Sequence, residues 1–145
     1  MYKNVKNNVV QFIKFGIVGL SNTVIGYFVY AFSLEVLRFF NIASEIDIYI
    51  SQALMFLISV LWSFYWNNKF VFKKQEGEKR NILLALLKTY ATYAFTSLFL
   101  AEVLLYIWVD ILGISEFIAP ILSLIITVPI NFFIQKFWAF KIYRD

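Results

Sequence analysis

The stretch Phe15–Leu34, FGIVGLSNTVIGYFVYAFSL, decides the fold class, because its twenty residues include no charged side chain. At 1.5 Å per residue, a helix of this length crosses the roughly 30 Å hydrocarbon core of a bilayer. Three stretches of similar length and composition follow it, at 48–66, 89–109 and 117–134, and they contain a single charge, Glu102. The sequence therefore predicts an all-α integral membrane protein with four transmembrane helices.

The composition excludes a soluble catalytic domain. Hydrophobic residues make up 61% of the 145-residue chain and charged residues 15%, against roughly 45–50% and 25% in soluble domains. The longest connection between spans, 67–88, is too short to enclose a hydrophobic core of its own. The chain has no Cys and no His, so thiolate nucleophiles and the commonest metal ligand are absent. We expect no enzymatic activity, no cofactor and no metal.

The Lys and Arg residues predict the orientation, because they are retained on the cytoplasmic side during membrane insertion. Of the 13 Lys and Arg residues, 12 lie in three segments, 1–14, 67–88 and 135–145. Because four spans cross the membrane in turn, these three segments lie on one side of it. The two opposite loops, 35–47 and 110–116, contain Arg38 alone. Both termini are therefore predicted to be cytoplasmic. No small-x-small cleavage site follows the first span, so we expect it to be retained.

The ends of the second and fourth spans resemble each other. Ser63–Lys73, SFYWNNKFVFK, aligns without gaps on Asn131–Lys141, NFFIQKFWAFK, and the two share two Phe residues and the final Lys. Upstream, a similar tetrapeptide places Lys14 and Lys88 at the cytoplasmic starts of the first and third spans. The chain is thus predicted to contain two repeats of two helices that run parallel within one transmembrane domain covering 1–145.

The boundaries of the repeats are predicted at about 10–73 and about 84–141. Ahead of the first span, apolar residues recur at helical spacing, which fits either a helix on the membrane surface or a continuous extension of the span. Within the span, small residues recur three or four positions apart and predict a face for close helix packing. They are Gly16, Gly19, Thr23 and Gly26.

Two exit motifs, Asn67–Phe72 and Gln135–Phe140, resemble the GtrA-like family of small four-helix membrane proteins. Spans of that family end in an Asn-basic-basic-Trp-Val-Phe pattern. The first motif keeps the Asn, one cation, the Val and the final Phe, and the second keeps the Trp and the final Phe. The likeness covers roughly residues 10–141. The departures leave open whether both copies contact the ligand or only one.

This resemblance implies translocation of a polyprenyl-phosphate-linked sugar across the bacterial cytoplasmic membrane. A partner glycosyltransferase makes the lipid on the cytoplasmic face, and the sugar decorates a wall or surface polysaccharide such as teichoic acid or O-antigen. Membrane lipids are further partners, and nucleic acid is not. Four thin spans form a narrow bundle for such a head group. A homodimer that encloses the path is therefore kept as an alternative to a monomer. The candidate residues for the lipid phosphate and sugar are Lys14, Asn22, Asn67, Lys69, Phe72, Lys88, Asn131, Lys136, Trp138 and Phe140.

For the phosphate, we expect Lys14 or Lys88 to act with Lys69 or Lys136. If the first and third helices begin near their lysines, their positive N-termini add to such a site. The alternative interpretation is interfacial anchoring by aromatic residues and lysines. Uncharged polar residues are expected to point inward, either toward the sugar or as helix-joining hydrogen bonds. They are Asn22, Thr23, Ser59, Ser63, Thr89, Thr92, Thr96, Thr127 and Asn131.

Glu102 lies deep within the third span and suggests two further interpretations. It is either a protonatable site that couples transport to protons or a neutral acid hydrogen-bonded between helices. Two alternative functions stay open with it. One is a non-transporting adaptor that docks a glycosyltransferase through the basic 67–88 loop, and the other is a proton-coupled exporter of small cations.

Overall fold

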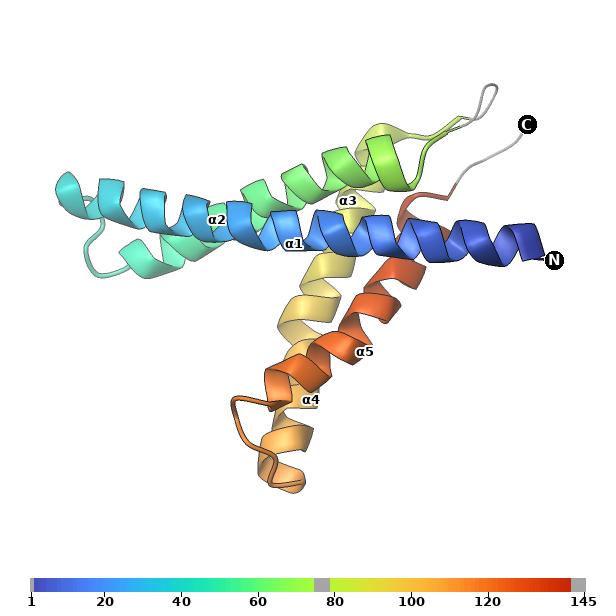
Figure 1. Cartoon of the computed structure of the whole chain (residues 1–145). Coiled ribbons are helices and arrows are strands. Elements are labelled where there is room, and N and C mark those ends of the chain that lie inside the picture. Colours follow the sequence, from blue (N-terminus) through green and yellow to red (C-terminus); the bar gives the residue numbers. More distant parts are fainter. Residues whose placement is uncertain (1, 75–78, 142–145) are drawn as a thin grey trace. The chain divides into compact units, whose positions relative to one another are not determined.

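The computed structural model describes residues 2–74 and 79–141, and all of the regular structure within them is helical (Figure 1). Four of the described helical stretches are long and apolar enough to cross a membrane. They are Asn7–Phe39, Asp47–Val71, Ile82–Ile111 and Ala119–Ala139. The prediction of an all-α protein with four spans is confirmed. The chain divides into two compact units, unit 1 at Met1–Val71 and unit 2 at Phe72–Asp145.

Unit 1 is a helical hairpin of α1 (Tyr2–Phe39) and α2 (Asp47–Trp66), the latter continued by the π-helical segment η1 (Asn67–Val71) (Figure 1). An ion pair joins the two ends of the connecting loop, with Nε of Arg38 2.8 Å from Oδ2 of Asp47. The other oxygen of Asp47 accepts the backbone N–H of Ile48 at 2.7 Å. The cation thus lies at a helix C-terminus and the anion at a helix N-terminus, as the helix dipoles favour.

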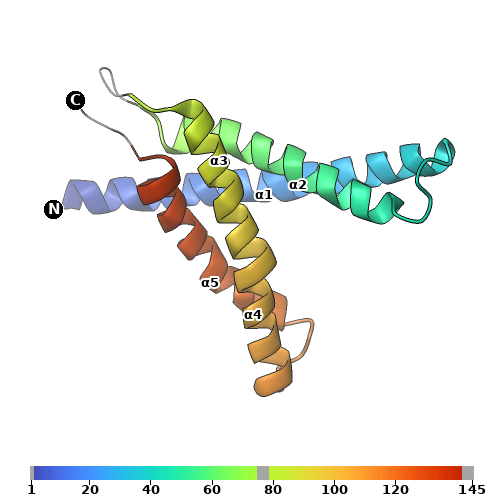
Figure 2. The same ribbon diagram turned by 180° about the vertical axis from the view of Figure 1, so that it is seen from behind.

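Unit 2 contains a second pair of helical stretches (Figure 2). Pro120 occupies the first turn of the second stretch, where the missing proline N–H costs no hydrogen bond. The loop before it turns at Gly113, whose φ of +66° suits glycine. The first stretch consists of α3 (Ile82–Tyr93), η2 (Ala94–Leu100), α4 (Ala101–Tyr106) and η3 (Ile107–Ile111), and the second of α5 (Ala119–Ile134) and η4 (Gln135–Ala139).

The helices begin earlier than the sequence suggests. Helix α1 is continuous from Tyr2, so the extension of the first span is confirmed and a separate surface helix is wrong. Helix α3 begins at Ile82, where the side chain of Asn81 accepts the N–H of Leu84 at 3.0 Å. Lys14 and Lys88 therefore lie well inside helices whose backbone N–H groups are already bonded. The expectation that helix N-termini at these lysines bind phosphate is wrong.

A buried polar pair recurs at the end of each second helix. In unit 1 the amide of Asn67 donates to Oγ of Ser63 at 3.1 Å. In unit 2 the amide of Gln135 donates to Oδ1 of Asn131 at 3.2 Å. All four side chains are buried, and they occupy positions that match in the alignment of the two exits. The two ends therefore share this local feature, and the division into two parallel repeats stays a prediction.

The small-residue face of α1 packs against α2 at one of its glycines. A Cβ atom at Gly26 would lie 3.4 Å from Cγ of Met55 and 3.5 Å from Cβ of Ser59. At Gly16 and Gly19, such an atom would meet nothing within 4 Å among the described residues. The packing prediction is therefore confirmed for Gly26 and wrong for the other two glycines within unit 1.

Candidate functional site: a lysine beside an aromatic row

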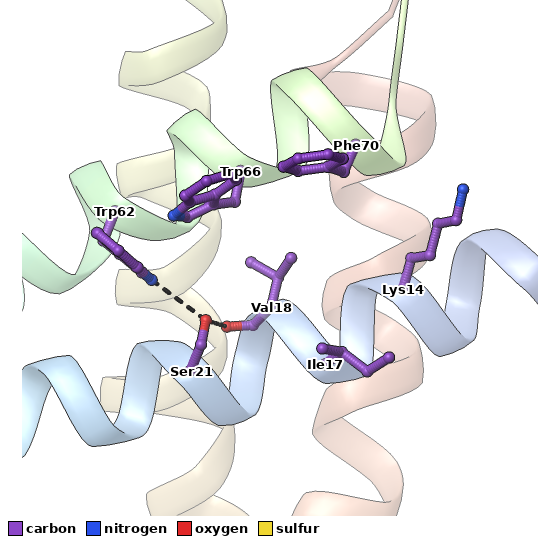
Figure 3. A pocket seen from close by; sticks show the side chains of 7 residues that line it. All are labelled: Lys14, Ile17, Val18, Ser21, Trp62, Trp66 and Phe70. Atoms are coloured by element: carbon purple, nitrogen blue, oxygen red, sulfur yellow. Dashed lines mark hydrogen bonds between the residues drawn. The ribbon is translucent and has the colours of Figure 1, made fainter.

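A pocket of about 340 Å³ lies between the two helices of unit 1 (Figure 3). Its α2 and η1 side carries a row of rings spaced four residues apart, which places them on one helix face. We call Trp62, Trp66 and Phe70 the aromatic row. The α1 side carries Lys14, Ile17, Val18 and Ser21.

Two polar side chains of this pocket are bonded within the protein, whereas the buried indole N–H of Trp66 has no hydrogen-bond partner among the described residues. The indole N–H of Trp62 donates to Oγ of Ser21 at 3.2 Å, and the same hydroxyl donates to the carbonyl of Val18 at 2.8 Å (Figure 3). The ammonium of Lys14 lies toward the other end of the group, on the side of Phe70 (Figure 3). The pocket therefore combines an apolar interior with one cation at its rim.

Lys69 adds a second cation to the aromatic row. Its ammonium lies 5.5 to 5.8 Å from the ring centroids of Tyr65, Trp66 and Phe70, within the range of cation–π attraction. It also hydrogen-bonds the Tyr65 hydroxyl at 3.3 Å. The rings of Trp66 and Phe70 stack at 4.9 Å. Lys69 thus lies against the aromatic row, and Lys14 lines the same pocket. That these two lysines hold a phosphate together stays a prediction.

In unit 2, the matching lysine contacts the exit directly. Nζ of Lys88 lies 3.4 Å from the carbonyl oxygen of Trp138 and 5.4 Å from the centroid of its ring. Lys136 lies over the rings of Phe132 and Phe137, at 5.5 and 5.9 Å. Both pairs of lysines are therefore placed at aromatic exits, but their surroundings differ.

Phe72 and Phe140 belong to a buried cluster of unit 2. The two rings stack at 4.7 Å, and Phe72 also stacks on Phe132 at 5.9 Å. Arg80 holds this cluster, since Nη1 donates to the Phe72 carbonyl at 2.9 Å and Cζ lies 5.1 Å from the Phe140 ring. From the sequence, Arg80 was one of the cations of the basic 67–88 segment, and no pattern there indicated that its side chain is buried. Direct ligand contact by Phe72 and Phe140 stays a prediction.

Most of the polar side chains expected to point inward are buried. Three threonines of α3 and η2 donate their hydroxyls to carbonyls four residues earlier, at 2.8, 2.7 and 2.9 Å. This bonding satisfies the hydroxyl inside its own helix and leaves the oxygen able to accept. Asn22 is half-buried, Thr23 is exposed against the prediction, and Glu102 is exposed on α4. The buried ones are Ser59, Ser63, Thr89, Thr92, Thr96, Thr127 and Asn131.

Both exit motifs adopt the wider π-helical turn. Segment η1 covers Asn67–Val71 and η4 covers Gln135–Ala139. In the second, the N–H of Phe140 bonds the carbonyl of Gln135, five residues earlier, at 2.8 Å. Local π turns are rare and are frequent at functional sites. The third span contains two further π-helical segments, η2 and η3, so this geometry is shared by the exits and is not confined to them.

Comparison with known proteins gives the family. The sequence profile described as GtrA/DPMS, transmembrane domain, matches residues 14–140, from Lys14 through the second exit motif. The chain belongs to this family. Its membership indicates a role in handling polyprenyl-phosphate-linked sugars, in a family that generally consists of small membrane proteins of the flippase type. No curated protein and no solved structure matches the chain.

Proposed function

We propose that this GtrA/DPMS family protein translocates a polyprenyl-phosphate-linked monosaccharide from the cytoplasmic to the outer leaflet of a bacterial membrane. The transferred sugar then serves glycosylation of a wall or surface polysaccharide such as teichoic acid or O-antigen. One observation carries the proposal within the family. In each unit, a lysine of the first helix lies beside aromatic side chains at the end of the second, at Lys14 and Lys88.

The chemistry of the passenger explains why such sites are useful. A glycosyl phosphate carries hydroxyl groups and a negative charge, which are costly to move into hydrocarbon without partners. Lysine supplies a compact positive charge for a phosphate, and the aromatic rings beside it supply apolar surface for the lipid. Buried polar side chains, such as Thr89 and Asn131, offer hydrogen-bonding groups within the spans.

Movement outward needs no nucleotide in this proposal. A membrane potential that is negative inside favours the exit of one negative charge by about 2.3 kcal/mol per 100 mV. A phosphodiester passenger therefore moves downhill electrically, and facilitated flipping is sufficient. The proposal assigns the protein no catalytic step and assigns the synthesis of the lipid to a separate cytoplasmic-face glycosyltransferase.

Liposomes that contain the purified full-length protein test the proposal. We expect the protein to scramble a fluorescent polyprenyl-phosphate monosaccharide between leaflets. The double variant Lys69→Gln with Lys136→Gln should lose this activity, because the exit cations are removed. The control variant Lys74→Gln should retain it, since this lysine is exposed.

The alternatives give different results in the same experiment. An adaptor binds the glycosyltransferase but leaves the labelled lipid in its original leaflet. A proton-coupled cation exporter is insensitive to the lysine pair and loses activity when Glu102 is replaced by Gln. Absence of scrambling by correctly folded protein, with or without the glycosyltransferase, rejects the flippase proposal.

A further inference from the structure

The two units differ at the positions that form the pocket of unit 1. The alignment of the exits places Trp62, Trp66 and Phe70 of unit 1 on isoleucines 130 and 134 and on Trp138 of unit 2. Unit 2 therefore keeps one ring of the row, at the outermost position. The family assignment treats the chain as one domain and does not distinguish the units.

We propose that the pocket of unit 1 is the binding site for the phosphate-proximal isoprene units of the lipid, with the phosphate held at Lys14. The matching region of unit 2 does not bind the ligand in this way. This inference rests on the proposed function, because it names the part of the lipid that one unit holds.

The interior of the pocket favours an apolar occupant over a sugar. A sugar inserted there would lose water from several hydroxyl groups, and each unpaired group costs several kcal/mol. The hydroxyl of Ser21 and the indole N–H of Trp62 already bond within the protein, and the indole N–H of Trp66 is buried without a partner among the described residues. The remaining surface comes from Ile17, Val18 and ring faces. A branched hydrocarbon chain covers such a surface without giving up hydrogen bonds of its own.

The rim of the pocket favours an anion. Lys14 is the charged residue of the seven that line the pocket, and Lys69 lies against two of the same rings. An apolar chain that ends in a phosphate places its charge next to these cations when the chain occupies the interior. A neutral lipid of the same chain length lacks this attraction, and free phosphate lacks the apolar contact.

The size of the pocket limits what it holds. Its volume of about 340 Å³ lies at the lower end of the roughly 300–1,000 Å³ range of small-molecule sites. A complete polyprenyl chain is far larger, so the pocket holds its first isoprene units and the rest of the chain extends into the membrane. Specificity then depends on the junction of chain and phosphate, and the sugar lies outside the pocket.

In unit 2 the equivalent lysine, Lys88, is already bonded within the protein. Lys88 hydrogen-bonds the carbonyl of Trp138 and lies over the same ring. A phosphate would have to replace both of these contacts of Lys88. Lys14, in contrast, is exposed where it lines the pocket of unit 1. Isoleucine also lacks the broad flat face with which the tryptophans of unit 1 line the pocket.

The test measures binding to the full-length protein in nanodiscs of neutral lipid. Unlabelled ligands compete with radiolabelled farnesyl monophosphate, and the displaced label is counted. Wild-type protein should bind farnesyl monophosphate at least about tenfold more tightly than farnesol, because only the phosphate forms a charge-assisted hydrogen bond with the lysine. Inorganic phosphate should not compete at the same concentrations.

Three variants separate the inference from its alternatives. Lys14→Gln should weaken farnesyl monophosphate binding about tenfold and leave farnesol binding unchanged, and Lys14→Arg should restore part of the loss. Trp62→Ile with Trp66→Ile, which copies the residues of unit 2, should weaken both ligands. Lys88→Gln should weaken farnesyl monophosphate binding less than Lys14→Gln does, because Lys88 is already bonded to Trp138. Lys74→Gln serves as the matched charge control.

The outcomes are decisive even where one variant fails to fold. Circular dichroism and gel-filtration elution identify an unfolded tryptophan variant, and the lysine variants then carry the test. Equal losses from Lys14→Gln and Lys88→Gln, or binding that is indifferent to Lys14, overturn the inference. Binding that depends on Lys14 without lipid scrambling rejects the flippase proposal alone. Scrambling without Lys14-dependent binding rejects the inference alone.

Discussion

Units 1 and 2 share a buried framework and differ on the surface beside it. Both end their second helix in a π turn that follows a buried side-chain pair, Asn67 with Ser63 and Gln135 with Asn131. Beside that framework, unit 1 has an open pocket with Lys14 at its rim, and unit 2 has Lys88 bound to Trp138. The comparison indicates that the framework maintains the helix pair, and that the aromatic and basic surface determines ligand binding.

The largest effect is expected at Gly26, where α1 packs against α2. Gly26→Leu forces a side chain onto Met55 and Ser59 and should destabilise unit 1 by up to about 3 kcal/mol, as overpacking does. Gly19→Leu is the control, because nothing lies within 4 Å of its Cβ position. Hydrogen exchange should rise in α1 and α2 for the first variant and not for the second. Equal exchange in both variants contradicts the packing.

The next largest loss of stability is expected when Arg80 of unit 2 is replaced. Arg80→Met removes the hydrogen bond to the Phe72 carbonyl and the cation over Phe140. Loss of a buried charged donor should cost about 2 kcal/mol. Hydrogen exchange should therefore rise in α5 and η4 and stay unchanged in α1. Lys79→Met, at an exposed position, is the control. Uniform destabilisation of both units would show that Arg80 does not act within unit 2.

The comparison of the two lysines predicts unequal effects on transport. Lys14→Gln should slow scrambling of the labelled lipid about tenfold, which equals 1.4 kcal/mol. Lys88→Gln should slow it less, because this lysine interacts with Trp138. Initial scrambling rates in liposomes at matched protein density measure the difference. Equal rates for the two variants would show that both units contribute alike.

The smallest effect is expected at the buried polar pairs. Asn67→Ala and Gln135→Ala each remove the hydrogen bond to the residue four positions earlier. Such contacts in membrane proteins average about 0.6 kcal/mol, so both variants should lose similar, small amounts of stability. Denaturant titration in mixed micelles measures them. A large difference between the two would contradict the shared framework.

The spans could be predicted from sequence because charge-free stretches of twenty residues have few alternatives to crossing a membrane. The exit motifs could also be located, and the structure places lysines and aromatic rings together there. The start of α1 could not be located, because Asn4, Asn7 and Asn8 are all N-cap residue types before Phe15 and no proline selects one of them. The spacing of Trp62, Trp66 and Phe70 was a visible signal of the pocket.

The burial of Arg80, the contrast between the two lysines and the role of each glycine depend on long-range contacts. The spacing of residue types along the sequence does not reveal such contacts. Arg80 is buried because it meets a carbonyl eight residues away and a ring far along the chain, at Phe140. The contrast between Lys14 and Lys88 depends on the side chains opposite them. Gly16 and Gly26 belong to the same small-residue pattern, but only Gly26 meets α2.

The uninterrupted course of α1 has a mechanical consequence. Its 38 residues make a rod of about 57 Å at 1.5 Å per residue, longer than the roughly 40–45 Å of a bilayer with its headgroups. An upright rod must protrude, and an enclosed one must lean. A protruding end extends the helix that carries Lys14 beyond the lipid headgroups as one continuous rod.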